Sequence, residues 1–368
     1  MIVVAGALMQ PHWLPPAELR SRLPRLSGFE DLATIDVQLP PATEALPREL
    51  AHDRWLRTQL EDAAEANDGV APGAMTAVRM LAPLGRHPAG WLVEPAHFHL
   101  ARDHLVMLAG AARGLVLEQA QRLVESIRPL LGEESLSLSL LSPTRWLLAS
   151  SPPLRLRCAS AEAASGRNVE GYLPGGEDER RYRRLLNEIQ MTWHEHPVNH
   201  EREARGELPI NSVWTSGPVT PRAVAAWNDG LAKRRFALDD SLLDARLRDD
   251  QADWLDALQA LDARLHELLA SKDAPSVLLC GDNEARWLQR RSRGAAAWPA
   301  ALGAAIGSTI GGTVAGIGHR LRNLRLAGTG QARPAPGHPQ APARDPKADA
   351  LACVFTELDA PPRSVARR

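Results

Sequence analysis

The sequence predicts an α/β protein in which helices pack on a mixed sheet, followed by a disordered C-terminal tail. Three observations support this prediction. Short apolar or alternating segments, typical of strands, occur between segments in which apolar residues recur every three to four positions, as in amphipathic helices. The N-terminal order of strand then helix favours an α/β layer. The composition, 44% hydrophobic and 24% charged, is that of a folded globular protein.

The predicted elements follow from these patterns in chain order. Residues 2–9 form an apolar strand, and a helix punctuated by prolines follows at 17–26. Residues 91–108 contain two short strand-like runs around a turn signal at Glu94 and Pro95. Leucine and serine alternate over 135–141, which predicts a hairpin that a third strand at 154–158 extends. The other expected elements are helices at 52–66, 117–131, 180–194 and 253–270 and strands at 211–215 and 276–280.

The domain organisation is expected to be one core, residues 1–293, with a further subdivision near 160–178 left open. Residues 294–325 form an Ala/Gly-rich segment, of which 294–318 carry no charge and include a GxxxGxxxG series. Such a series suits close helix packing in a bilayer, but strongly lipophilic residues are few. We therefore favour a linker or surface helix over membrane contact. The tail, 326–368, is rich in Pro, Ala, Gly and charge and is predicted to be disordered.

Charge and cysteine usage limit the partners and the compartment. The formal net charge of −1 provides no basic field, so no nucleic-acid partner is predicted. The three cysteines are widely spaced and form no CxxC pair, which indicates a reducing compartment. Because the first residues lack a basic leader, we interpret them as a buried strand and expect a cytoplasmic protein.

The most distinctive run of the sequence is 187–214, which contains the densest set of potential metal ligands. His194, His196 and His200 lie near Glu195 and Glu201 in this run. The HExxH zinc motif is absent, and Pro197 interrupts the geometry directly after a predicted helix end. We therefore favour helix capping by His194 and His196 and an exposed His200. No metal and no cofactor are predicted, and the three histidines remain weak candidates as ligands.

Polar side chains of the same run allow two interpretations. They could line a pocket for a small ligand, with an arginine binding a carboxylate or phosphate through paired hydrogen bonds. Alternatively, they could fix a long loop to the core by satisfying its backbone groups, and this second role is favoured. The candidate ligand-binding residues are Asn187, Glu188, His194, Asn199, Arg202, Arg205, Asn211 and Ser212.

Complete catalytic motifs are missing from the sequence. It contains no GxSxG nucleophile elbow, no GxxxxGK[ST] phosphate loop and no strand-linked GxGxxG. Cys280, Gly281 and Asp282 follow a predicted strand, where α/β proteins often place ligands. That single feature does not define a reaction.

Three stretches of the sequence resemble the bacterial RpfE-type regulatory proteins. They are NEIQMTWHEHPVN, REARGELPINSVW and WLVEPAHFHLARDHLVML, within a patchy resemblance over about residues 1–290. Members of this family are often described as similar to cofactor-independent phosphoglycerate mutases. The resemblance implies a cytoplasmic regulatory or ligand-sensing protein, without catalytic activity, that binds a small ligand or a protein partner near 187–214.

The resemblance to mutases implies an alternative, a metal-dependent phosphoryl-transfer enzyme acting as an isomerase. Such enzymes need a Ser or Thr nucleophile and two metals held by Asp and His. Where they carry an Asp-Gly motif after the first strand, this sequence has Ala5, Gly6 and Ala7, and the nearest later Asp-His pair is Asp103 and His104. The resemblance therefore implies a related α/β scaffold more firmly than it implies mutase activity.

Overall fold

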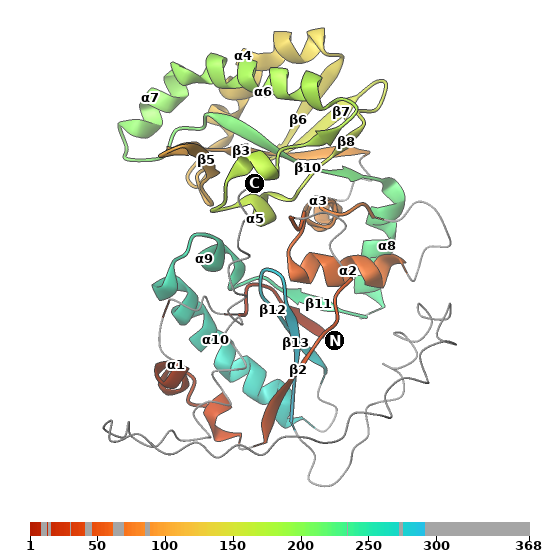
Figure 1. Cartoon of the computed structure of the whole chain (residues 1–368), viewed down its shortest axis with the longest axis vertical. Helices are drawn as coiled ribbons and strands as arrows, with labels where there is room; N and C mark the ends of the chain where they lie inside the picture. Colours follow the sequence, from red (N-terminus) through yellow and green to blue (C-terminus); the bar gives the residue numbers. More distant parts are fainter. Residues whose placement is uncertain are drawn as a thin grey trace, which may run out of the picture.

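Two main sheets, one five-stranded and one four-stranded, organise the chain (Figure 1). The structure, a computed structural model, describes residues 1–8, 13, 16–29, 31–40, 46–61, 70–84, 89–233, 235–271 and 275–290. The mixed arrangement of helices and sheets confirms the fold class predicted from the sequence.

The five-stranded sheet has the strand order β11-β1-β12-β13-β2. Its strands are β1 (Ile2–Val4), β2 (Leu32–Asp36), β11 (Ala237–Asp239), β12 (Val277–Cys280) and β13 (Ala285–Arg290). Strand β1 runs parallel to β11 and β12, whereas β12, β13 and β2 pair antiparallel. The carboxyl ends of β1, β11 and β12 therefore meet at one edge of the sheet, where ligands bind in many α/β proteins.

Helices cover both faces of this sheet because its central strands are apolar on both sides. Val3 pairs with Leu278 and Val4 with Leu279, so alternate residues enter two separate cores. Helices α2 (Ala51–Glu61), α3 (Met75–Leu81) and α8 (Pro221–Ala232) contribute to the first core. Helices α1 (Pro16–Arg22) and α10 (Gln251–Ala270) contribute to the second.

The four-stranded sheet is antiparallel, with the order β10-β3-β7-β6. Its strands are β3 (Gly90–Ala96), β6 (Leu136–Ser142), β7 (Arg145–Ser150) and β10 (Ser212–Val219). Helices α4 (Leu117–Glu133) and α6 (Glu179–His194) lie on the face turned away from the other sheet (Figure 1). Trp146 and Trp193 meet edge to face in the buried layer beneath them.

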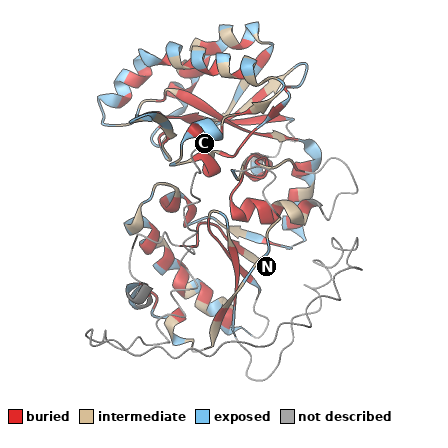
Figure 2. Cartoon of the chain, viewed as in Figure 1, coloured by how far each residue is buried: buried red, intermediate tan, exposed pale blue. Residues whose placement is uncertain are grey.

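The remaining elements are short, and the buried residues lie mainly in the two main sheets and on the helix faces packed against them (Figure 2). These short elements are α5 (Ala161–Ala164), α7 (Pro197–Glu203), α9 (Leu243–Leu247), β4 (Phe98–Ala101), β5 (His104–Met107), β8 (Leu156–Arg157) and β9 (Gly175–Gly176), with 3-10 turns η1 (Leu26–Gly28), η2 (Ala82–Leu84) and η3 (Val169–Gly171). Helices α3, α5 and α9 lie between the two sheets in Figure 1.

Several predicted boundaries were wrong. The first strand ends at Val4 and the first helix at Arg22, both earlier than predicted. No turn occurs at Pro95, since β3 continues through it. Pro95 pairs with β10, whereas β7 pairs only with Trp91–Val93. The N–H that proline lacks is therefore not needed for pairing with β7. The expected third strand of the hairpin is β8, which pairs with the glycines of β9 instead. Pro197 does not begin a loop but occupies the first turn of α7, where its lack of an N–H costs nothing.

The predictions for residues 294–325 and 326–368, including membrane contact through 294–318, lie outside the described residues. Among the helices that are described, none is long and apolar enough to cross a membrane. The subdivision near 160–178 stays a prediction.

Candidate functional site

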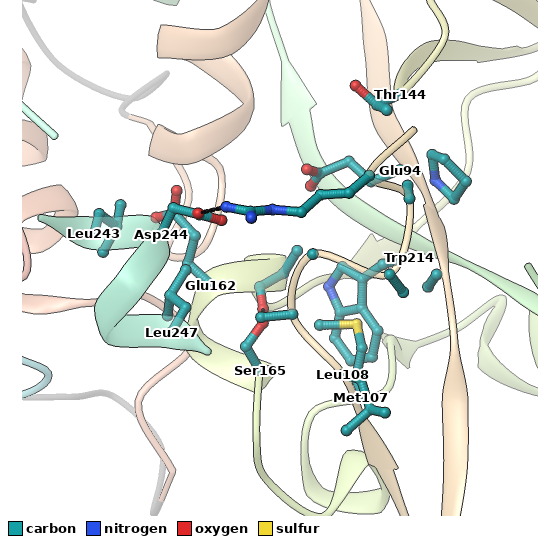
Figure 3. Close-up of a pocket in the computed structure, with 18 of the residues that line it drawn as sticks. Glu94, Met107, Leu108, Thr144, Glu162, Ser165, Trp214, Leu243, Asp244 and Leu247 are labelled. Atoms are coloured by element: carbon teal, nitrogen blue, oxygen red, sulfur yellow. Dashed lines mark hydrogen bonds and ion pairs between the residues drawn. The ribbon is translucent and has the colours of Figure 1, made fainter. Parts of the chain in front are cut away.

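A cavity of about 380 Å3 lies between the two sheets. One side of its wall comes from β3, β10 and the turn between β6 and β7, and the other comes from α9 (Figure 3). Trp214 and Met107 provide apolar surface, and Glu94, Glu162 and Asp244 provide carboxylates. Cavities of this size, mainly apolar with a few polar groups, are typical of sites for small molecules.

The cations of the cavity differ in how far they are neutralised. Arg79 is paired with buried carboxylates, and Arg113 forms an ion pair with Asp244. The side chain of Arg145, in the first position of β7, makes no hydrogen bond or ion pair with the residues that the structure describes. Its exposed guanidinium is therefore the cation in this wall best able to meet an anionic ligand.

Glu94 is a second notable group of the cavity wall. It is partly buried, and its Oε2 atom is buried with no hydrogen-bond partner in the described part of the chain. Burial, together with the nearby charge of Glu162, raises the pKa of Glu94 to about 7, although Arg145 and Arg79 oppose the shift. The carboxyl group therefore changes its charge near neutral pH.

A buried polar cluster made of His52, Asp53, Thr76, Arg79 and Glu162 adjoins the cavity and shares Arg79 and Glu162 with its wall. The first two residues begin α2, Thr76 and Arg79 belong to α3, and Glu162 belongs to α5. The Nε atom of Arg79 donates to Oδ1 of Asp53 at 3.1 Å, its Nη2 atom donates to Glu162, and Thr76 donates to Asp53. Although burial favours the neutral acid, Arg79 and His52 hold the pKa of Glu162 below its usual value.

His52 differs from its neighbours because it is fully buried and neither ring nitrogen makes a hydrogen bond to the described residues. Its Nε2 atom lies 3.5 Å from Oδ1 of Asp53 and 3.4 Å from Oε2 of Glu162. These three side chains form a group that could hold a metal ion.

The start of α2 is fixed at the carboxyl edge of the parallel strands. The backbone N–H of Ala51 donates to the carbonyl of Asp282, the second residue after β12. The buried polar cluster therefore lies where ligands are commonly bound in an α/β sheet.

Arginines neutralise the carboxylates that follow the parallel strands. Asp282 is paired with Arg167 and Arg246, and Asp239 is paired with Arg264. At Gly6, after β1, φ is +67° and an added Cβ atom would lie 2.9 Å from the Cα of Leu243. The segment expected to correspond to an acidic metal motif is thus tightly packed backbone.

The histidines singled out in the sequence do not converge on one point. His194 and His200 are exposed, with Nε2 atoms 3.5 Å and 3.2 Å from the carboxylate oxygens of Glu195. His196 caps the N-terminus of α7, accepting a hydrogen bond from the N–H of Val198 at Nδ1, and not the end of α6 as expected. A role for these histidines in metal binding stays a prediction.

Three of the predicted ligand-binding residues direct their polar groups to the backbone. Asn199 bonds the carbonyls of Trp193 and Ile210 and the N–H of Ile210. Asn211 bonds both backbone groups of Phe98. Arg202 donates to the carbonyls of Leu208, Ala111 and Arg113. These contacts fix the loop, which is the role the sequence favoured for this run.

The other predicted ligand-binding residues are separated from one another: Asn187, Glu188 and His194 lie on α6, Arg205 follows α7, and Ser212 is buried at the start of β10. Asn187 is exposed, Glu188 lies 3.7 Å from Arg184, and Arg205 is paired with Glu207. Ser212 accepts a hydrogen bond from Gln190, and His194 lines a shallow pocket together with Asn211. None of the eight candidates lines the cavity between the sheets. Their role in ligand binding stays a prediction.

No family model matches the chain. Over 102 residues the chain is 32% identical to a 2,3-bisphosphoglycerate-independent phosphoglycerate mutase from Methanosarcina barkeri (strain Fusaro / DSM 804). This match covers 27% of the chain and 26% of the mutase, so the chain spans about a quarter of the length of that curated relative.

Two solved structures are also similar to the chain. A cofactor-independent phosphoglycerate mutase from Thermoplasma acidophilum DSM 1728 is 17% identical to the chain, with a TM-score of 0.29. The match covers 80% of this chain and 90% of the mutase. The PH0037 protein from Pyrococcus horikoshii is 12% identical to the chain, with a TM-score of 0.38. The match covers 78% of this chain and 86% of the PH0037 protein. At these scores the structural similarities carry no argument about function. What the sequence comparison establishes is a local likeness to phosphoglycerate mutases.

Proposed function

We propose that this protein is phosphoglycerate mutase-like in ligand recognition and binds a small phosphorylated carboxylic acid in the cavity between its two sheets. The cavity itself carries the proposal, because it is lined by Arg145, whose guanidinium makes no hydrogen bond or ion pair with the described residues. A guanidinium binds phosphate or carboxylate through paired, charge-assisted hydrogen bonds. The 32% identity to a phosphoglycerate mutase over 102 residues supports phosphoglycerate as the first ligand to test.

Binding without turnover is the favoured activity, in keeping with the regulatory or ligand-sensing role that the RpfE-type resemblance implies. Two-metal phosphoryl transfer needs two ions that stabilise the attacking and leaving oxygens. Within the described residues, a single group of three side chains could hold a metal, and Asp239 and Asp282 are engaged by arginines. A ligand sensor needs only the cavity and its cation.

Calorimetric titration of 3-phosphoglycerate into the full chain tests this function. We expect binding to the wild type and a loss on the order of 10-fold or more in affinity for Arg145→Ala, since hydrogen bonds to charged groups contribute about 1.5–3 kcal/mol. Arg128→Ala is the matched control, because Arg128 is an exposed arginine on α4 that pairs with Glu125 and does not line the cavity. Absence of binding, or equal affinity of Arg145→Ala and wild type, would refute the proposal.

The alternative is the mutase reaction itself, which the local identity to a phosphoglycerate mutase favours. A coupled assay for conversion of 3-phosphoglycerate to 2-phosphoglycerate, with Mn2+ present, separates the two functions. Turnover that Arg145→Ala abolishes and Arg128→Ala retains would establish the enzyme. Binding without turnover supports the sensor.

A further inference from the structure

We propose that His52, Asp53 and Glu162 form a binding site for one divalent transition-metal ion of the Zn2+ class. The site is separate from the histidine-rich run of the sequence and from the open cation Arg145. It shares only Glu162, and its neighbour Arg79, with the wall of the cavity. The inference therefore stands whether or not the cavity binds a phosphorylated acid.

The spacing of the three ligand atoms suits a metal ion better than a direct hydrogen bond. The Nε2 atom of His52 lies 3.5 Å from Oδ1 of Asp53 and 3.4 Å from Oε2 of Glu162, and the group spans no more than 4.8 Å. Hydrogen bonds between nitrogen and oxygen are commonly about 2.7–3.2 Å long. Two ligand atoms, each about 2.1 Å from a tetrahedral zinc ion, lie roughly 3.4 Å apart.

The second oxygen of each carboxylate is held from outside the site. Oδ2 of Asp53 accepts a hydrogen bond from Thr76, and Oε1 of Glu162 accepts one from Arg79. Outer partners of this kind orient metal ligands and keep their free lone pairs directed at the ion. Oδ1 of Asp53 also accepts a hydrogen bond from Nε of Arg79 at 3.1 Å, and Oε2 of Glu162 lies 3.5 Å from the hydroxyl of Thr76. Both oxygens lie within 3.5 Å of Nε2 of His52.

The burial of His52 also favours a metal ion at this position. The side chain is fully buried, and neither imidazole nitrogen makes a hydrogen bond to the described residues. Burying such nitrogens without a hydrogen bond costs free energy. A metal ion would satisfy Nε2.

The donor set indicates the class of metal. One imidazole nitrogen and two carboxylate oxygens form a mixed set that Zn2+ accepts, whereas Mg2+ and Ca2+ prefer oxygen ligands alone. The fourth position would be taken by water or by the hydroxyl of Thr76, which lies 3.5 Å from Oε2 of Glu162.

Metal analysis of the full chain, produced with added Zn2+ and dialysed without chelator, tests the site. We expect about one zinc per wild-type chain and affinity weaker on the order of 100-fold in His52→Gln. Thr76→Val, which removes the hydroxyl that donates to Asp53, should weaken binding by about 10-fold. His200→Gln is the matched control, because His200 also lies near a carboxylate but is exposed. Less than about a tenth of an equivalent in the wild type, or full binding by His52→Gln, would overturn the proposal.

A spectroscopic measurement covers the case in which His52→Gln does not fold. X-ray absorption of the wild-type zinc protein should show one imidazole nitrogen, with oxygen in the remaining positions. Sulfur donors or two imidazoles would place the metal elsewhere in the chain and contradict the site.

Discussion

The Nε2 atom of His52 lies 3.4 Å from Oε2 of Glu162, and this contact joins the helix that starts at the edge of the first sheet to α5 beneath the second. Arg79 pairs with the same carboxylate from α3. The cluster thus connects three short helices between the two sheets. Its charges should contribute to the stability of the fold as well as to any function.

Replacing Glu162 by Gln is expected to destabilise the protein strongly. Arg79 is only 8% exposed, and the substitution removes a negative charge that faces it. Leaving a buried charge without compensation typically costs about 3–5 kcal/mol, and the loss here should be smaller because Arg79 keeps its ion pair with Asp53. Urea unfolding should show this loss in the free energy of unfolding.

Glu125→Gln on α4 is the control for that measurement. Glu125 pairs with Arg128 three residues later, and both side chains are exposed. An exposed pair of this type contributes little to the free energy of unfolding. Equal losses in the free energy of unfolding of the two variants would mean that the buried ion pair stabilises the fold no more than the exposed one.

Local patterns in the sequence predicted the elements but not this cluster. The helix stripes at 117–131, 180–194 and 253–270 correspond to α4, α6 and α10, since amphipathic periodicity reports directly on the buried face. His52, Arg79 and Glu162 lie in three separate segments, and no spacing rule joins them. Their proximity depends on tertiary packing, which a single sequence does not encode as a motif.

The run 187–214 has closely spaced polar residues along the chain. In the structure those residues point in different directions: His194 and His200 are exposed, whereas Asn199 and Arg202 are buried against backbone. The sequence could indicate that the loop is ordered. It could not indicate that the cavity lies elsewhere, because its wall is assembled from seven different segments of helix, strand and loop.

Gly6→Ala is expected to destabilise the fold at the carboxyl edge of β1. The residue has φ of +67°, and a Cβ atom there would lie 2.9 Å from the Cα of Leu243. Both the left-handed conformation and the contact with α9 backbone oppose a side chain, at a cost of about 1–3 kcal/mol. Gly28→Ala, where a Cβ atom would meet nothing within 4 Å, is the control by thermal unfolding. A Gly6→Ala protein as stable as wild type would contradict the packing described here.

The raised pKa of Glu94 predicts how stability changes with pH. In the folded chain that pKa is about 7, against 4.5 for the ordinary side chain. Between these values the folded state binds more protons than the unfolded state, so the contribution of Glu94 to stability falls as pH rises from about 4.5 to about 7 and is constant above. Glu94→Gln should remove this decline and be more stable than wild type at pH 8.

Urea titrations of wild type and Glu94→Gln at pH 5, 6, 7 and 8 check this prediction. The difference between the two free energies of unfolding isolates Glu94 from other titrating groups. A difference that does not change with pH would show that Glu94 titrates normally.

Asn199→Ala is expected to separate loop stability from ligand binding. The side chain is 2% exposed and makes three hydrogen bonds, to the carbonyls of Trp193 and Ile210 and from the N–H of Ile210. Their loss leaves buried backbone groups unpaired, at a cost of about 1–3 kcal/mol. Since Asn199 does not line the cavity, the affinity for 3-phosphoglycerate measured below the unfolding temperature should stay that of wild type. A variant with normal stability and lost affinity would instead place the ligand at the 187–214 loop.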